Sequence, residues 1–154
     1  MYAKSEIIVN KLFRNKFDKA GEPYVRHLYR VSGSLDEPIE KVAGLLHDKI
    51  EDTEITEEDL IEIGFPQEII DIVKLVTKKK VDTTDMTKVE KLALYNEEID
   101  NIIKSGNIHA IRLKEADMSD NCNPQRLKRL PIDEQLWLEE KYVKQLKKLR
   151  NVKG

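Results

Sequence analysis

The stretch 44-GLLHDKIEDTE-54 begins as an apolar helix and ends as a cluster of charge. Residues four apart on a helix share a face, so His47 pairs with Glu51, and Asp48 pairs with Asp52. Adjacent helical positions are only about 100° apart, so His47 and Asp48 can both lean toward one point. An imidazole and three carboxylates gathered there repel one another unless a cation lies among them. The stretch therefore predicts a divalent metal site at the end of a core helix.

Two residues elsewhere in the chain are candidates to complete such a site. They are His27, in the sequence GEPYVRH, and Asp117, in the sequence KEADMSDN. With His47 and Asp48 they form the order His…His-Asp…Asp. Two neutral imidazoles and two carboxylates together balance the charge of a divalent ion. The mixed nitrogen and oxygen donors suit Mn²⁺, Fe²⁺ or Zn²⁺ and do not choose among them.

The composition of the chain excludes several classes of protein. Its 154 residues suit one domain, and we expect a single domain over residues 1–154. The net charge of −2 gives no basic field for nucleic acid, and no apolar run approaches the ~20 residues of a membrane helix. The N-terminus lacks the apolar core of a signal peptide. The lone Cys122 favours a reducing cytosol, so we expect a cytoplasmic protein in which this thiol is inert.

Apolar residues recur at helical spacing and strand-like alternation is absent, so we expect an all-α, compact multi-helix fold. Pro38 suits the first turn of a helix, and Thr56 with Asp59 resembles a capping box. The expected helices are Lys4–Lys16, one from Tyr24 to Gly33, one from Pro38 into the opening stretch, a short one between Thr56 and Gly64, one from Pro66, then Lys88–Lys104, Ile108–Asp117 and Asp133–Leu149.

The four candidate ligands, in this order, resemble the HD-domain superfamily of metal-dependent phosphohydrolases. Three longer stretches, GEPYVRH, AGLLHDKIEDT and LKEADMSDN, more closely resemble the hydrolase domain of the Rel/Spo alarmone enzymes and their small stand-alone relatives. The resemblance covers roughly residues 3–121. It implies an HD-domain fold and a phosphohydrolase that acts on a nucleotide. In its sharpest form, it implies removal of the 3′-pyrophosphate of guanosine 3′,5′-bis(diphosphate), ppGpp.

Carried over position by position, the resemblance also implies individual roles. The partner it implies is a small nucleotide or other phosphorylated molecule, with no nucleic acid and no membrane, and an oligomer is compatible with it. The ion it implies is Mn²⁺, with Fe²⁺ and Zn²⁺ as alternatives. The implied residues are the metal ligands His27, His47, Asp48 and Asp117, the catalytic acids Glu51 and Asp52 that act on the attacking water, and the substrate-side residues Lys19 and Asn121.

Two departures from the family pattern bear on the substrate. Before GEPY the family has Arg-Lys-Ser, with an Arg that resembles a stacking partner for guanine, whereas this chain has Asp18-Lys19-Ala20. An Asp supplies no flat cation, and we expect it to repel phosphate. After Asp117, the sequence MSDN replaces the family's Arg-Leu-His-Asn type. Two other readings therefore stay open: a hydrolase of another nucleotide or phosphorylated metabolite, and a non-catalytic nucleotide-binding module that keeps the metal for stability.

Four further features have structural interpretations. His109 matches no ligand position, and we expect it to be structural or exposed. Lys78–Lys80 is typical of a solvated helix end favoured by the helix dipole. We expect Trp137 and Tyr142 to make core or dimer contacts and not to form a base-stacking platform. For Lys114, support of substrate phosphates and pairing on the surface with the neighbours of Glu115 both stay open.

Overall fold

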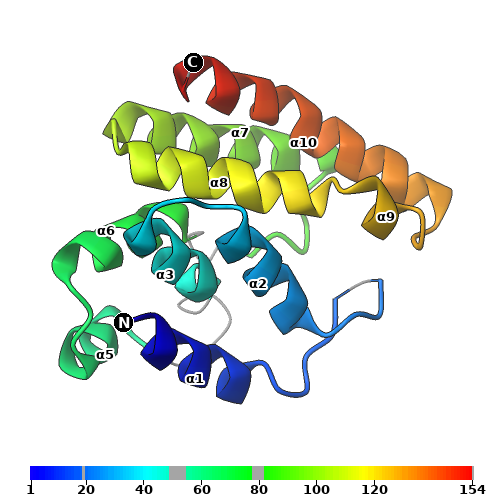
Figure 1. Ribbon diagram of the computed structural model, residues 1–154. Coiled ribbons are helices and arrows are strands. Elements are labelled where there is room, and N and C mark those ends of the chain that lie inside the picture. Colours follow the sequence, from blue (N-terminus) through cyan, green and yellow to red (C-terminus); the bar gives the residue numbers. More distant parts are fainter. Residues whose placement is uncertain (19, 49–54, 78–81, 154) are drawn as a thin grey trace.

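The computed structural model describes residues 1–18, 20–48, 55–77 and 82–153 (Figure 1). Apart from an isolated antiparallel bridge between Phe17 and Pro23, these residues contain no β-structure. The all-α fold predicted from the sequence is therefore confirmed. The helices are α1 (Tyr2–Leu12), α2 (Tyr24–Gly33), α3 (Pro38–Leu46), α5 (Glu57–Ile63), α6 (Gln67–Val76), α7 (Lys88–Ser105), α8 (Ile108–Asn121), α9 (Pro124–Leu127) and α10 (Ile132–Lys153).

Local sequence signals set several helix boundaries. Thr56 and Asp59 form the expected capping box at the start of α5, where each side chain accepts a hydrogen bond from the other residue's backbone N–H. Gly64 ends α5 with a φ of 108°, a left-handed conformation that disfavours other residues. A second capping box, Thr87 with Glu90, begins α7. Such caps satisfy backbone donors that the first turn of a helix leaves unpaired.

Two helices differ from their expected ranges at one end. α1 stops at Leu12 instead of Lys16, because the next residue, Phe13, leaves the helix and is buried in the core. α10 continues past Leu149 to Lys153. No Gly or Pro interrupts the chain before Gly154, so this helix lacks a stop signal.

α8 also runs further than expected, to Asn121 instead of Asp117. The chain contains no helix breaker there until Pro124, so one more turn forms. Residues three and four apart share a helix face, and the added turn therefore places Asp120 and Asn121 on the same side as Asp117. This extension brings Asp120 to the functional site.

α3 is the central helix of the fold and packs against α1, α2, α6 and α8. Gly44 permits the close approach of α2, because a Cβ at that position would lie 3.2 Å from the Cα of Ser32. The approach brings the end of α3 beside the middle of α2. The buried apolar and small residues of α3 are Val42, Ala43, Gly44, Leu45 and Leu46.

α7, α8 and α10 lie together on the other side of the molecule from α1 and α5 (Figure 1). α10 packs along both α8 and α7, and α8 in turn packs against α2 and α3. Tyr95 and Tyr142 meet edge to face between α7 and α10, with ring centroids 5.5 Å apart. Such a pair adds about 0.5–1.5 kcal/mol beyond the area it buries. α8 is thus fixed between two layers of helices, and its polar residues are held in place.

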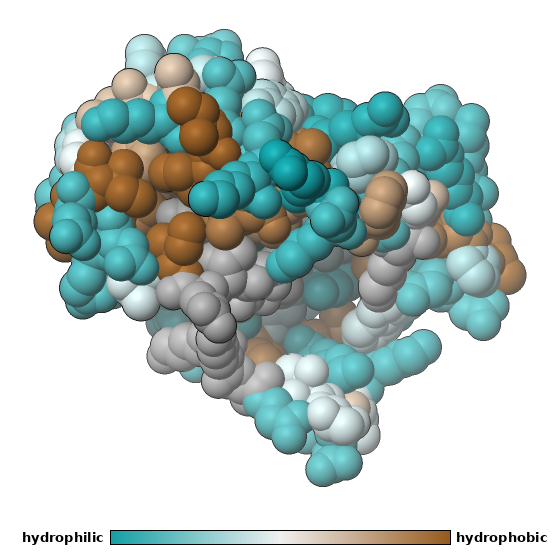
Figure 2. Space-filling model, turned by 90° about the horizontal axis from the view of Figure 1, so that it is seen from below, coloured by the Kyte–Doolittle hydropathy of each residue, from teal (hydrophilic) through white to brown (hydrophobic). Residues whose placement is uncertain are grey.

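The surface seen from below carries α1 and α5. Hydrophobic residues gather toward one side of this face, and hydrophilic residues cover much of the rest (Figure 2). The exposed apolar side chains of these two helices include Ile7, Ile61 and Ile63. Among the described helices, none combines the length and the apolar character that crossing a membrane requires.

Candidate metal centre and adjoining cavity

The four predicted ligands meet where α2, α3 and α8 come together. His27 lies in α2, Asp117 lies in α8, and His47 and Asp48 directly follow the last residue of α3. One donor atom of each residue lies within 4.8 Å of the donor atoms of the other three. The structure therefore brings together all four residues that the sequence order singled out.

The donors converge on Asp117 Oδ1. His27 Nε2 lies 2.9 Å from this oxygen, and His47 Nε2 lies 3.1 Å from it. Asp48 Oδ2 is 3.2 Å from His47 Nε2 and 4.0 Å from His27 Nε2. His27, His47 and Asp117 are buried, whereas the Asp48 side chain is 16% exposed. The cluster is therefore closed on three sides and open at Asp48.

The second ring nitrogen of each histidine is already occupied. His47 Nδ1 lies 2.6 Å from the carbonyl oxygen of Gly44, which can only accept, so His47 donates from Nδ1. His27 Nδ1 lies 2.6 Å from Asp120 Oδ2. Neutral rings with the proton on Nδ1 direct their Nε2 lone pairs toward the carboxylates. Two nitrogen acceptors and two carboxylates that face one another fit a divalent cation.

The same convergence increases the proton affinity of the imidazoles. Burial lowers the pKa of His47, but the charges of Asp48 and Asp117 outweigh burial and raise this pKa to about 9. The pKa of His27 is also raised, because hydrogen bonds to two carboxylates outweigh its burial. Burial raises the pKa of Asp117, and the nearby Lys114 and His47 bring it well below its ordinary range. Protons and a metal ion therefore compete for the same donors.

Lys114 is part of this centre. Its side chain is buried, and its Nζ lies 3.3 Å from Asp117 Oδ2 and 5.5 Å from the ring centroid of Tyr95. The surface pairing considered for Lys114 is wrong, because α7 covers this face of α8. Lys114 pairs with Oδ2 of Asp117 and leaves Oδ1 facing the histidines.

Several sequence-predicted residues lie outside the described residues. These are the catalytic acids Glu51 and Asp52, the substrate-side Lys19, and the lysine run Lys78–Lys80. The pairing expected between His47 and Glu51 on one helix face involves a residue outside the described ranges, so it also stays a prediction. The roles of Glu51, Asp52 and Lys19 stay predictions.

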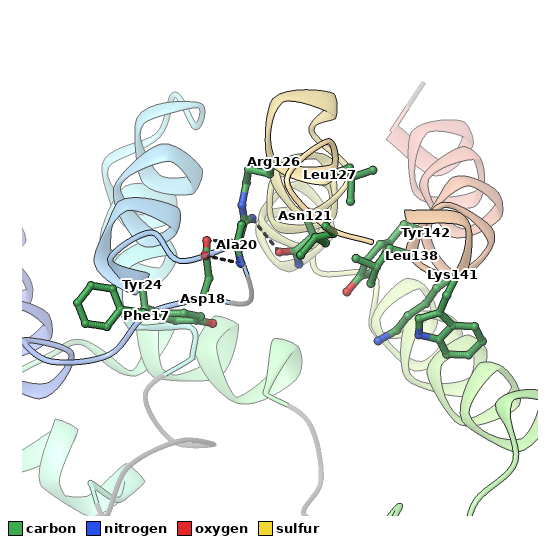
Figure 3. Close-up of a pocket in the computed structure, with 12 residues that line it drawn as sticks. Phe17, Asp18, Ala20, Tyr24, Asn121, Arg126, Leu127, Leu138, Lys141 and Tyr142 are labelled. Atoms are coloured by element: carbon green, nitrogen blue, oxygen red, sulfur yellow. Dashed lines mark hydrogen bonds and ion pairs between the residues drawn. The ribbon is translucent and has the colours of Figure 1, made fainter. Parts of the chain in front are cut away.

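A cavity of about 410 Å³ is lined by the loop before α2 and by residues of α2, α8, α9 and α10 (Figure 3). Two of its lining residues contact the metal ligands directly. The Tyr24 hydroxyl donates a hydrogen bond to Asp48 Oδ2, and Asn121 Nδ2 lies 3.5 Å from Asp117 Oδ1. Asn121 thus lies at the junction between the cavity and the cluster, and its substrate-side role stays a prediction.

α10 forms the opposite wall of the cavity (Figure 3). Tyr142 is buried against Tyr95, as expected for a core residue. Tyr142 also lines the cavity, together with Lys141 and the half-buried Trp137. The expectation that Trp137 makes core or dimer contacts stays a prediction. The cavity combines an aromatic face and a cation, which suits a planar, negatively charged ligand.

Asp18 lines the cavity, yet its charge is neutralised. Its Oδ1 accepts hydrogen bonds from the backbone N–H groups of Ala20 and Glu22, both at 2.9 Å, and its Oδ2 accepts one from Arg126 Nη2 at 2.9 Å. The side chain is only 6% exposed. Burial raises the pKa of Asp18, but these hydrogen bonds and Arg126 lower it overall. An arginine of α9 therefore pairs with the carboxylate that was expected to repel phosphate, and the repulsion stays a prediction.

Sequence reasoning missed Asp120, Arg30 and Arg126. Asp120 Oδ1 accepts from Arg30 Nε at 2.7 Å, and Oδ2 accepts from Arg126 Nη1 at 2.9 Å. Burial raises the pKa of Asp120, while His27 and Arg30 bring it down to about 2. The spacing of Asp120 from Asp117 was a usable signal once α8 was extended. No local pattern indicates that Arg126, on a four-residue helix, reaches the same place.

Cys122 and His109 agree with their structural interpretations. Burial raises the pKa of the Cys122 thiol to about 11, so the thiol stays protonated and is a poor nucleophile. His109 lies away from the predicted ligands, and its Nδ1 is 2.6 Å from Glu40 Oε2. Neither residue belongs to the metal centre.

No protein-family model matches the chain. A protein of Mycoplasma genitalium named probable guanosine-3′,5′-bis(diphosphate) 3′-pyrophosphohydrolase is 35% identical over 150 residues, which cover 87% of this chain and 20% of that protein. A Mycoplasma pneumoniae protein of the same name is 38% identical over 115 residues, which cover 68% and 15%. A GTP pyrophosphokinase of Myxococcus xanthus is 42% identical over 79 residues, which cover 49% and 10%. The chain thus spans a fifth or less of the curated relatives it matches.

A solved structure described as a metazoan ortholog of SpoT that hydrolyzes ppGpp has a similar fold. Its TM-score is 0.68 at 23% identity, and the match covers 98% of this chain and 92% of that one. At this identity the likeness establishes the fold alone. The two mycoplasma relatives confirm the resemblance to the Rel/Spo-type hydrolase domain that the sequence motifs indicated.

Proposed function

We propose that the chain is a metal-dependent phosphohydrolase that acts on a nucleotide, and in its sharpest form on the 3′-pyrophosphate of guanosine 3′,5′-bis(diphosphate). The observation that carries this proposal is the convergence of His27, His47, Asp48 and Asp117 beside a cavity large enough for a small ligand. The names of the curated relatives support the substrate class. A nucleotide substrate agrees with a cytoplasmic location, and we assign the chemistry to one domain over residues 1–154.

The donor set fits a divalent ion, for which we propose Mn²⁺, with Fe²⁺ and Zn²⁺ as alternatives. When bound, such an ion supplies Lewis acidity that activates water and polarises a phosphoryl oxygen. His27 and His47 offer neutral Nε2 donors because their Nδ1 protons are already committed. Asp48 and Asp117 offer the negative charge that a divalent ion requires. Lys114 keeps one oxygen of Asp117 occupied and so orients the other.

Glu51 and Asp52 act on the water in this proposal. One of them accepts a proton from the water as its oxygen attacks phosphorus, and the bond from phosphorus to the 3′ oxygen breaks. The leaving 3′ oxygen takes up a proton and becomes a hydroxyl, so the products are pyrophosphate and the nucleoside 5′-diphosphate. General-base catalysis of this kind contributes about 10²–10⁴-fold to the rate.

The cavity holds the part of the nucleotide that does not react. Asn121 lies at the junction with the metal ligands, where it can contact the phosphate that is attacked. Trp137 and Lys141 line the cavity from α10 and offer an aromatic face and a positive charge. Lys19 lies in sequence between two lining residues, Asp18 and Ala20, which supports its assignment to the substrate.

A panel of nucleotides that includes ppGpp, incubated with Mn²⁺-loaded protein, tests this function through release of phosphate or pyrophosphate. We expect pyrophosphate release from ppGpp. Glu51→Ala is expected to retain the ion and lose most of the turnover, by about 10²–10⁴-fold. Glu54→Ala, which removes a nearby acid without an assigned role, is the matched control and is expected to retain the rate.

Results other than these support a different function or mechanism. Hydrolysis of another member of the panel would replace ppGpp as the substrate and keep the reaction class. Full activity in Glu51→Ala would remove Glu51 from the mechanism. A metal-loaded protein that hydrolyses nothing, and that His47→Ala merely destabilises, would be a binding module and not an enzyme.

A further inference from the structure

We propose that Asp18, Arg126 and Asp120 form a positioning relay that connects the wall of the cavity to the metal ligand His27. The relay deepens the proposed function, on which it rests, because it fixes the ring orientation and tautomer that metal binding requires. None of its three members is a metal ligand, and the sequence motifs assigned a role to none of them. Both departures from the family pattern, at position 18 and after Asp117, fall on this relay.

The first contact of the relay is between Asp120 and His27. Asp120 Oδ2 lies 2.6 Å from His27 Nδ1, and both side chains are buried. A carboxylate that accepts the Nδ1 proton leaves Nε2 free, and His27 Nε2 is the atom that faces Asp117 and Asp48. Such a partner behind a histidine ligand fixes the ring and increases its basicity toward a metal.

The second contact holds Asp120 itself. Arg30 lies one helical turn beyond His27 in α2 and binds Asp120 through Nε at 2.7 Å and Nη2 at 3.1 Å. Arg126 approaches from α9 and binds Asp120 Oδ2 through Nη1 at 2.9 Å. Two guanidinium groups thus hold one carboxylate in place. Arg30 also binds Glu22 of the loop before α2, through Nη1 at 3.3 Å, whereas Arg126 binds Asp18, which lines the cavity.

The third contact joins Arg126 to Asp18. Arg126 Nη2 binds Asp18 Oδ2 at 2.9 Å (Figure 3). Its Nη1 binds Asp120, so one guanidinium bridges two carboxylates through its two terminal nitrogens. The planar fork of arginine allows this bridge, which a single lysine ammonium on a flexible stem reproduces poorly. Asp18 is itself fixed by the backbone N–H groups of Ala20 and Glu22. The loop that lines the cavity is therefore connected to His27 through three consecutive polar contacts.

The chain offers two internal controls. His47, the other histidine ligand, donates to the backbone carbonyl of Gly44 and needs no side-chain support. Arg129 lies three residues after Arg126 and binds Glu22 of the same loop at 2.8 Å, instead of Asp18. Removal of Arg129 therefore breaks a comparable contact between the same two segments and leaves the relay intact.

The first experiment measures the affinity for Mn²⁺ by calorimetry. Asp120→Asn is expected to weaken binding by about 10–100-fold, the range typical for partners behind a metal ligand. Arg126→Lys and Asp18→Asn are expected to weaken it several-fold. Asn at position 18 keeps the Oδ1 acceptor for the loop and replaces Oδ2, which accepts from Arg126, by an NH2 donor. Arg129→Ala is expected to bind Mn²⁺ like the wild type.

A double variant separates a relay from three independent effects. Asp18→Asn is expected to have no further effect on Mn²⁺ affinity in the Asp120→Asn background, because the contact it transmits is already lost. Additive losses would overturn the relay. If Asp120→Asn fails to fold, Asp18→Asn is combined with Arg126→Lys and the same non-additivity is expected.

Nitrogen-15 NMR of the imidazoles in Zn²⁺-loaded protein supplies a readout that general destabilisation does not move. We expect a hydrogen-bonded, slowly exchanging Nδ1–H signal from both His27 and His47. In Asp120→Asn the His27 signal is expected to shift or exchange faster, while the His47 signal stays. Unchanged Mn²⁺ affinity together with an unchanged His27 signal would overturn the relay alone. A wild-type protein that binds neither ion would overturn the proposed function and the relay with it.

Discussion

α3 carries a cluster of histidine and carboxylate groups at each end, and the two clusters differ in charge balance. His47 and Asp48 follow its C-terminal end, where they meet His27 and Asp117. At the N-terminal end, Glu37 and Glu40 meet His109. Both sets have the composition and the proximity of a metal site. Their surroundings decide which of them needs an ion.

At the N-terminal end, positive charge is already present. Glu40 Oε2 lies 2.6 Å from His109 Nδ1 and 3.2 Å from Arg112 Nη1. The helix dipole also favours carboxylates there. At the C-terminal end the dipole disfavours acids, and Lys114 pairs with only one of the two carboxylates. Converging acceptors without a sufficient partner, and not residue types alone, therefore distinguish the cluster for which we propose an ion.

The largest expected effect comes from removing a ligand of the C-terminal cluster. Asp48→Ala is expected to abolish metal retention and, with it, activity, while most helix content stays, because Asp48 lies beyond the last residue of α3. Metal analysis after gel filtration, together with circular dichroism, checks this. The matched change in the other cluster, Glu40→Ala, is expected to leave the metal content unchanged. Metal retention in Asp48→Ala, or loss of the metal in Glu40→Ala, would contradict the assignment of the ion to the C-terminal cluster.

The sequence was sufficient for the fold class and for the four residues that the fold brings together as candidate ligands, for different physical reasons. Helix starts and stops depend on local signals such as the Thr56 capping box and Gly64, and these act over one turn. The ligands followed from the spacing of His47 and Asp48 and from a family resemblance in which His27 and Asp117 occupy recognisable motifs. Both sources of information lie within short segments of the chain.

What the sequence did not predict depends on contacts between distant segments. Arg126 reaches Asp18 and Asp120 only after α9 has docked on the loop that follows α1. Lys114 is buried because α7 covers its side of α8, which no periodicity of α8 indicates. These features follow from tertiary packing, and a single sequence records tertiary packing only weakly.

An intermediate effect is expected from pH in the metal-free protein. The pKa of His47 is raised from 6.5 to about 9 in the folded state, so its contribution to stability is fully present below pH 6.5. This contribution is lost as pH rises through about 9. A shift of this size corresponds to at most about 3 kcal/mol of unfolding free energy. His27, whose pKa is also raised, acts in the same direction.

Urea unfolding of chelator-treated protein between about pH 6 and 9.5 measures this loss. Mn²⁺ is expected to restore stability at the upper end, because the ion takes the place of the protons. His47→Gln is expected to flatten the profile, whereas His109→Gln in the other cluster is expected to keep it. A flat profile in the wild-type metal-free protein would show that the C-terminal cluster is not held together by protons.

The smallest effect is expected at the N-terminal cluster, from Glu40→Gln. The substitution removes a buried charge that pairs with Arg112 and His109, and breaking such a contact costs about 1–3 kcal/mol. We expect the lower end of this range, because the Arg112 side chain is 41% exposed and water can solvate it. Glu37→Gln is the matched control. Its carboxylate is 52% exposed and 3.9 Å from Arg112, so its loss is expected to change stability by less than about 0.5 kcal/mol.

The stability lost in Glu40→Gln is also measured with and without Mn²⁺, which tests whether an ion binds at the N-terminal cluster. If Arg112 fully serves as the cation of the N-terminal cluster, the stability lost in Glu40→Gln is the same with and without Mn²⁺, and turnover at saturating Mn²⁺ is unchanged. A second Mn²⁺ that binds the wild type and not Glu40→Gln would show that Arg112 leaves room for an ion. In that case charge balance would not separate the two ends of α3, and the open side at Asp48, next to the cavity, would be the feature that distinguishes the catalytic cluster.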